Sequence, residues 1–363
     1  MDARIARPCP LGASDVTARR ASPLASRSGT LAALTLALIL AVALLVALSS
    51  NPLGALRAFF WGPVSSGLAW GNLLNQALLL TLTGLAAALA FGAGSFNLGG
   101  EGQTYTGGLA ALAASLILPS VWGASGILVL LVAGAAAGAL LGGLSGWLKV
   151  RFDADEMITT FLLSASAVPF IDALMTGPGL GAPESMLIQS RPVPQAFWIP
   201  GLLAPSSFHV GVLLALPLVV LFGVLVNHTP WGYRLRLMGR NRDFARYAGI
   251  STGFYALMPL GLSGGLHGLA GALGVLGTQH ALVQGFSAGW GWNGIAVALI
   301  ARTNPWAVAP AALLLAFLDQ ASRTVVLQGQ FPFQLSALFQ AFILFFITAR
   351  VVLPRWRNRR RTS

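Results

Sequence analysis

The chain has 363 residues, of which 56% are hydrophobic and only 9% are charged, whereas about a quarter of the residues in a typical soluble protein carry a charge. Its mean hydropathy of +0.75 and its many apolar runs of about 18 residues or more exclude a soluble globular domain and predict an all-α, polytopic integral membrane protein. The single cysteine, Cys9, excludes an internal disulfide framework and a multi-cysteine metal site. We expect no metal and no cofactor.

Residues 1–29 are polar and rich in arginine, and we expect them to form a disordered cytoplasmic tail. A signal peptide is the alternative, because a basic region precedes an apolar one. However, the apolar run at 30–48 has about 19 residues, which is longer than the usual signal-peptide core of about 7–15 residues. We interpret it as the first of about ten transmembrane helices in a domain that spans 30–353. The other nine are expected near 72–93, 101–118, 124–148, 156–175, 208–228, 252–276, 291–303, 305–321 and 334–353.

The distribution of basic residues favours an even number of crossings. With the N-terminus in the cytoplasm, 19 of the 22 lysine and arginine residues fall on the cytoplasmic side, and the basic tail 354–363 lies there as well. An odd number would place that tail outside. The net charge of +12 is thus explained by topology and by contact with anionic lipid, so we expect no nucleic-acid partner.

Two blocks of the chain, 72–175 and 252–353, share one order of a span, a glycine-rich break and further spans. They begin on opposite sides of the membrane, which predicts two inverted repeats with broken helices. Such repeats place a transport pathway at their interface, because backbone groups freed at membrane depth must line a cavity or be covered by protein. The two breaks are therefore the candidate pathway.

The first break, at 95–103, reads Ser-Phe-Asn-Leu-Gly-Gly-Glu-Gly-Gln and contains Asn97, Glu101 and Gln103. An ionised glutamate at the bilayer centre would cost about 2.5–3.5 kcal/mol, so Glu101 should face protein or water. We expect the three side chains to shape or gate one half of the pathway. Alternatively, Glu101 braces the broken helix by capping backbone donors, or the whole stretch is a tight cytoplasmic turn.

The second break ends in Gly-Trp-Gly-Trp-Asn-Gly at 289–294, which contains Trp290, Trp292 and Asn293. The spacing matches G-x-G-x-x-G, but no βαβ unit surrounds it, which excludes a dinucleotide-binding fingerprint. The tryptophans either anchor the chain at the membrane interface or stack on a ring-shaped ligand, with Asn293 supplying hydrogen bonds. Both interpretations remain open.

Two further patterns lie inside single spans. Glycines recur every four residues at 134, 138, 142 and 146, which predicts a face along which a neighbouring helix approaches closely. His267 is a lone imidazole in an apolar span, so it is either a hydrogen-bonded interior residue or part of a proton relay.

The loop 229–250 lies on the cytoplasmic side in this topology. Its run 242–248 predicts a short amphipathic helix with Phe244, Ala245 and Ala248 on one face and arginines on the other. It is either a basic anchor on the lipid surface or a docking helix for a cytoplasmic partner. The candidate docking residues are Gly239, Arg240, Asn241, Phe244, Ala245, Ala248 and Gly249.

No catalytic set is visible, so the chain is not expected to be an enzyme. A phosphate-binding P-loop needs G-x-x-x-x-G-K-[ST], and the only lysine of the chain, Lys149, lies outside such a context. Any ATP hydrolysis that drives this protein must therefore take place on another subunit.

Four stretches together resemble the permease subunits of bacterial ABC importers for simple sugars and nucleosides. They are 96–103, similar to that family's F-N-I-G-x-E-G-Q; 155–160, similar to N-E-V-I-x-T; 239–250, similar to G-x-N-x-x-A-A-x-x-A-G-I; and 289–305, similar to G-x-G-F-D-G-I-A-V-A-L-x-x-x-x-N-P. The chain departs from the family pattern at Ser164, Phe244, His267 and Asn293.

The resemblance implies a bacterial plasma (inner) membrane protein in which two permeases, identical or sister subunits, form the pathway. Cytoplasmic ABC ATPase subunits would drive it through a coupling loop at 229–250, and an external binding protein or lipoprotein would deliver the solute. The alternative is a proton-coupled secondary transporter with Glu101 and His267 as the relay.

Overall fold

The structure is a computed structural model that describes residues 51–182 and 184–327, together with a few isolated positions outside these ranges. The predicted tails and the predicted spans 30–48 and 334–353 lie outside the two ranges. Within them the chain is built from helices, and its only β-type pairings are isolated bridges in loops. The all-α prediction is confirmed.

The helices follow the apolar runs of the sequence closely. In chain order they are α2 (Pro52–Trp61), α3 (Gly67–Gly92), α4 (Gly100–Ile117), α5 (Gly123–Phe152), α6 (Glu156–Thr176), α7 (Val212–His228), α8 (Pro230–Arg240), α9 (Arg242–Tyr247), α10 (Thr252–Leu273) with its π-helical extension η4 (Gly274–Gln279), α11 (Trp290–Ile300) and α12 (Pro305–Leu327). Short 3-10 turns occur at Gly62–Val64, Ser120–Trp122 and Gln195–Phe197.

Five of these segments are long and apolar enough to cross a membrane: α3, α5 with its preceding turn, α6, α10 with η4, and α12. The pair α7 and α8, bent by 72°, is a sixth candidate. Helix α11 has 11 residues, so at 1.5 Å per residue it covers about half of the bilayer core. The predicted crossing at 291–303 is thus a half-length helix.

Two helices were not predicted from the sequence, α2 and α8. Each begins with a proline after a capping side chain: Asn51 accepts from the Gly54 N–H, and Thr229 accepts from the Gly232 N–H. Proline suits the first turn of a helix because its missing N–H would be unpaired there. In α8 the same proline and the glycines read as turn signals in the sequence.

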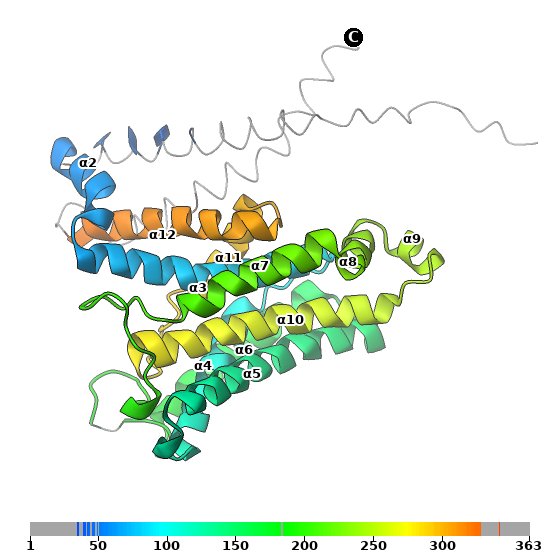
Figure 1. Cartoon of the computed structure of the whole chain (residues 1–363), viewed down its shortest axis with the longest axis horizontal. Coiled ribbons are helices and arrows are strands. Elements are labelled where there is room, and N and C mark those ends of the chain that lie inside the picture. Colours follow the sequence, from blue (N-terminus) through cyan, green and yellow to red (C-terminus); the bar gives the residue numbers. More distant parts are fainter. Residues whose placement is uncertain are drawn as a thin grey trace, which may run out of the picture.

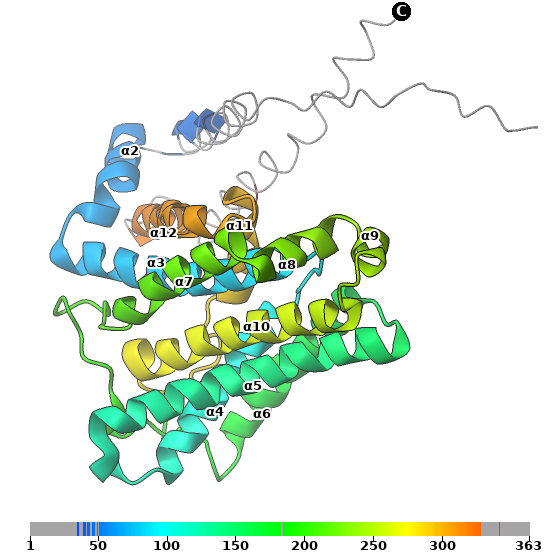
Figure 2. The same cartoon turned by 45° about the vertical axis from the view of Figure 1, so that its right-hand side comes forward.

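The helices pack in an order that places α3 at the centre (Figures 1 and 2). Helix α3 is largely buried and contacts α10, α11 and α12. Helices α4 and α5 pack against the other side of α10. Helix α6 lies at the outside of the bundle and is mostly exposed, so lipid or another protein chain must cover it.

The predicted close approach along the glycine face of α5 is confirmed, and its partner is α10. A Cβ atom on Gly138 would lie 2.3 Å from the carbonyl oxygen of Gly264, and one on Gly142 would lie 2.4 Å from that of Leu260. The backbones touch because α5 carries only glycine at both contacts, and α10 also carries glycine at Gly264.

Candidate functional site

The first break is a loop between α3 and α4 that is held by buried amides. The side chains of Asn97 and Gln103 are 0% and 1% exposed. The Asn97 amide donates to Gln103 Oε1 (2.8 Å), and the Gln103 amide donates to Asn97 Oδ1 (3.1 Å). Asn97 also donates to Ser263 Oγ on α10 (2.9 Å). In this conformation the two amides bind each other and brace the break.

Glu101, in the first turn of α4, connects the two breaks. The Ser287 hydroxyl donates to its Oε1, and the Gly291 N–H donates to its Oε2 (3.0 Å). Gly291 lies in the first turn of α11, where the helix dipole favours an anion. These contacts hold α4 against the start of α11. The helix whose N-terminus Glu101 caps is α11 and not α4.

Helix α6 is fastened to the same break by two hydroxyl groups that were not among the candidate site residues. The Leu98 N–H donates to Thr160 Oγ1 (3.1 Å), and the Gly102 N–H donates to Ser164 Oγ (2.7 Å). A Cβ atom on Gly102 would lie 2.5 Å from Ser164 Cα. The small serine therefore suits this close approach.

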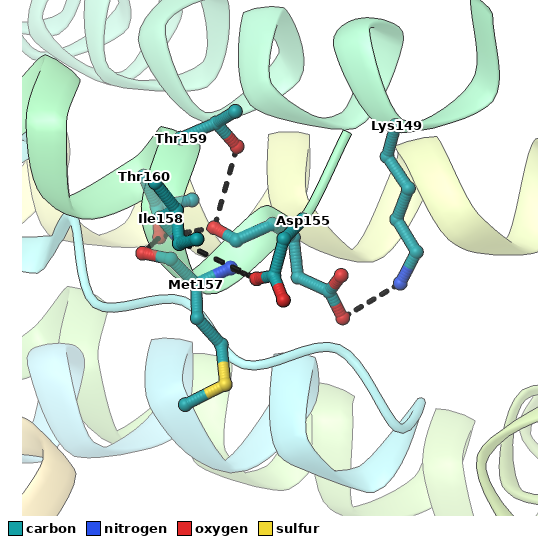
Figure 3. Close-up of polar contacts among 7 residues, drawn as sticks. Lys149, Asp155, Met157, Ile158, Thr159 and Thr160 are labelled. Carbon is teal, nitrogen blue, oxygen red and sulfur yellow. Dashed lines mark hydrogen bonds and ion pairs between the residues drawn. The ribbon is translucent and has the colours of Figure 1, made fainter. Parts of the chain in front are cut away.

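The start of α6 is fixed by charged side chains (Figure 3). Asp155 Oδ1 accepts from the N–H groups of Met157 (2.8 Å) and Ile158 (3.3 Å). Lys149, at the end of α5, lies 2.6 Å from a carboxylate oxygen of Glu156, and both side chains are largely buried. The α5–α6 connection is thus closed by a helix cap and an ion pair.

The two tryptophans of the second break have different environments. Trp290 is 5% exposed and packs edge-on against Phe286, with ring centroids 5.8 Å apart. Trp292 is 43% exposed, and its ring centroid lies 6.2 Å from that of Phe161 on α6. Asn293 is half-buried beside it. Trp290 belongs to the core, whereas Trp292 is exposed.

His267 is fully buried, and its Nδ1 donates to the carbonyl oxygen of Ser263 (2.9 Å). Its ring packs on Gly100, where a Cβ atom would lie 2.5 Å from Nε2. Among the described residues, no hydrogen bond joins His267 to Glu101, whose carboxylate faces Ser287 and α11. The geometry is that of an interior histidine.

The predicted helix at 242–248 is present as α9, and Asn241 Oδ1 caps it by accepting from the Phe244 N–H (2.9 Å). The predicted common face is found only in part. Ala245 is fully buried, whereas Phe244 is 55% exposed and Ala248 is exposed as well. Successive residues of a helix point about 100° apart, so packing at Ala245 turns Phe244 outward.

The exposed surface of α8 and α9 combines aromatic and basic side chains. Its aromatic members are Tyr233, Phe244 and Tyr247, which are 59%, 55% and 94% exposed, and its basic members are Arg234, Arg240, Arg242 and Arg246. Arginine and tyrosine are enriched in protein interfaces. We call this the α8–α9 surface.

Gly239 connects this surface to the first break. A Cβ atom on Gly239 would lie 2.6 Å from the carbonyl oxygen of Gly92. One on Gly94, whose φ of 76° starts the loop that leads into the break, would lie 2.7 Å from Gly239 Cα. The end of α8 therefore rests directly on the backbone turn that follows α3. Gly249, with a φ of 75°, faces open space after α9.

Residues 70–348 match the family model described as "Branched-chain amino acid transport system / permease component". The chain belongs to this family of permeases. The match covers most of the chain and includes both breaks and the α8–α9 surface.

Relatives with assigned solutes extend the comparison. The "Probable riboflavin import permease protein RfuC" of Treponema pallidum is 33% identical over 88% of this chain and 84% of its own. The glucose ABC transporter permease TsgB13 of Haloferax volcanii is 31% identical over 86% and 84%. The guanosine ABC transporter permease NupP of Bacillus subtilis is 30% identical over 77% and 80%. The protein is thus an ABC importer permease.

Proposed function

We propose that this permease imports a small ring-shaped solute, a nucleoside, flavin or sugar, and that separate ATPase subunits drive it by binding the α8–α9 surface. The contact of Gly239 with the turn at 92–94 carries this proposal. It provides a short path from a cytoplasmic docking surface to the first break, and from there through Glu101 to α11.

The solute class rests on the aromatic pair at the second break. Trp292 and Phe161 are both exposed, with ring centroids 6.2 Å apart, and aromatic rings stack on planar or ring-shaped partners. Riboflavin, guanosine and glucose, named for the relatives, all contain rings. Asn293, adjacent in the chain, adds hydrogen-bond donors and acceptors.

The exposed outer helix α6 supports a second permease as partner, identical or a sister subunit. Phe161, Leu162 and Phe170 are 44%, 56% and 64% exposed on it. With Phe161 beside Trp292, a second permease on this face would enclose the aromatic pair. An extracytoplasmic binding protein or lipoprotein would deliver the solute, and both termini would lie in the cytoplasm of a bacterial cell.

The proton-coupled alternative has no support from the family or from the geometry, since Glu101 and His267 bind different partners. The test is uptake in proteoliposomes that contain the permease, its sister permease where one exists, the ATPase subunits and the binding protein. We expect uptake of one of the three solute classes that needs ATP and persists with a protonophore. Uptake that stops with the protonophore and survives without ATP would refute the proposal.

A further inference from the structure

A cavity of about 340 Å³ lies where α3 and α7 end and α12 begins. Its wall includes three arginines, Arg236 and Arg240 on α8 and Arg302 in the turn between α11 and α12. Among the residues that the structure describes, no aspartate or glutamate lines it. The wall of the cavity therefore carries positive charge, which favours an anion over a cation inside it.

Two of the arginines are fixed by the backbone around them. The Arg236 guanidinium donates to the carbonyl oxygen of Val226 at the end of α7. Arg302 and the following Thr303 have φ values of 55° and 57°, in the left-handed region that residues other than glycine seldom adopt. Strained backbone of this kind is concentrated at binding sites, and here it holds Arg302 at the cavity wall.

The other groups at the wall also suit an anion with several oxygens. Helix α12 begins there, and the positive end of its dipole favours an anion. Asn304 Oδ1 accepts from the Trp306 N–H (3.3 Å), and the same side chain carries an amide N–H2 that can donate to an anion. The guanidinium group of an arginine can donate two parallel hydrogen bonds to two oxygens of one phosphate.

An exposed tryptophan lies in the first turn of the helix that begins at the cavity, which favours a position near the membrane–water interface. Trp306, in the first turn of α12, is 42% exposed, and its ring packs on Gly223 of α7. Tryptophan is concentrated at the membrane–water interface. In the proposed orientation this end of the bundle faces the cytoplasm, where the leaflet is rich in anionic phospholipid.

We propose that this cavity binds a phosphate ester or phosphate ion at the cytoplasmic surface, supplied by an anionic phospholipid headgroup or by soluble phosphate. Only the side of the membrane rests on the proposed function; the anion site rests on the cavity itself. An occupant would join α8 to the end of α3 and to the α11–α12 turn.

The experiment measures lipid binding to the purified full-length permease by native mass spectrometry. Phosphatidylglycerol is compared with phosphatidylcholine of the same acyl chains, and inorganic phosphate is added as a competitor. The test variant is Arg240→Gln with Arg302→Gln. The matched control is Arg234→Gln with Arg242→Gln, which removes the same charge from exposed positions of α8 and α9 outside the cavity.

We expect the wild type to prefer phosphatidylglycerol. The test variant should lose about tenfold or more of that binding, while the control keeps it.

Displacement of the lipid by inorganic phosphate would identify soluble phosphate as the occupant, and resistance to displacement would identify the lipid. Each of these results supports an anion site. Equal binding of phosphatidylglycerol and of phosphate by the test and control variants would overturn it. If the test variant fails to fold, Arg240→Lys with Arg302→Lys keeps the charge and should retain part of the preference. The isolated permease is sufficient, so failure of ATP-driven uptake would leave this result unaffected.

Discussion

Glu101 is the residue that joins the two breaks, since it lies in α4 and caps α11. A carboxylate partly withdrawn from water needs hydrogen-bond donors in place of water, and Ser287 and Gly291 are such donors. Any movement that separates α4 from α11 must therefore release the carboxylate. We therefore expect Glu101 to hold α4 and α11 together.

Replacing Glu101 with alanine should lower the free energy of unfolding by about 1.5–3 kcal/mol, because donors at the start of α11 lose a charged acceptor. Glu101→Gln keeps one acceptor oxygen and should lose less. Thermal unfolding in detergent measures both. Glu184→Ala, which removes a carboxylate from an exposed loop position, is the control. Equal unfolding temperatures for Glu101→Ala and the control would show that Glu101 does not hold α4 and α11 together.

The two tryptophans of the second break should respond differently to alanine. Trp292→Ala should leave unfolding nearly unchanged and weaken solute uptake about two- to tenfold, because stacking contributes about 0.5–1.5 kcal/mol. Trp290→Ala should instead cost about 3–5 kcal/mol of stability, as for other buried aromatic residues. Uptake assays and thermal unfolding of both variants separate these effects. Unchanged uptake by Trp292→Ala in a folded protein would remove it from the solute site.

Sequence reasoning located residues at the breaks, whose part in solute transport stays a prediction. Asn97, Glu101 and Trp290 were candidates because polar or aromatic groups interrupt apolar runs; Asn97 and Trp290 are buried, Glu101 is partly buried, and each makes contacts that hold a break together. Thr160 and Ser287 act across the fold, far from their partners in the chain. Neither residue type stands out in a helix or loop, so only the packing reveals these contacts.

At the scale of elements, the contact between α5 and α10 offers a matched pair of glycines. Gly138→Ala should destabilise the protein by about 1–3 kcal/mol, because the new methyl group would overlap the Gly264 carbonyl. Gly143 lies on the same helix with no neighbour near its Cβ position, so Gly143→Ala should be neutral or stabilising by up to about 1 kcal/mol. Thermal unfolding of the two variants decides. A similar loss in both would mean that α5 does not approach α10 along this face.

The junction of α8 with the first break can be tested through Gly239. Gly239→Ala would place a methyl group 2.6 Å from the Gly92 carbonyl oxygen and must shift α8. We expect ATPase stimulation by solute-loaded binding protein to fall at least about fivefold, the lower end of typical coupling energies. Gly253→Ala, where the new group makes an ordinary 3.5 Å contact, is the control. Stimulation equal to that of the control would exclude this junction from coupling.

The helices themselves were largely predictable, because long apolar runs in a membrane protein leave few alternatives to helix. Helix α8 was missed since Pro230, Gly232 and Gly239 resemble loop signals. In the structure Pro230 starts the helix. A Cβ atom on Gly232 would lie 2.2 Å from the Val226 carbonyl oxygen, so glycine at this position allows the sharp bend from α7. These glycines serve close contacts rather than turns, which a single sequence does not distinguish.

For the whole molecule, the orientation in the membrane is the prediction with the widest reach. After Cys9→Ser removes the only cysteine, new cysteines at Met186 and Tyr247 report on opposite ends, and these positions are 104% and 94% exposed. A membrane-impermeant maleimide should label Met186→Cys in intact cells and Tyr247→Cys only after permeabilisation. The reverse pattern would invert the topology and remove the ATPase from the α8–α9 surface.

The ion pair between Lys149 and Glu156 has a practical consequence, because Lys149 is the only lysine of the chain. A lysine-specific protease therefore has one peptide bond to cut, the bond after Lys149, and produces fragments of 149 and 214 residues. That bond lies in the last turn of α5, with the amine bound to a carboxylate. The rate at which the two fragments form consequently measures how often the α5–α6 connection opens. Gel electrophoresis can follow this rate at each stage of the transport cycle.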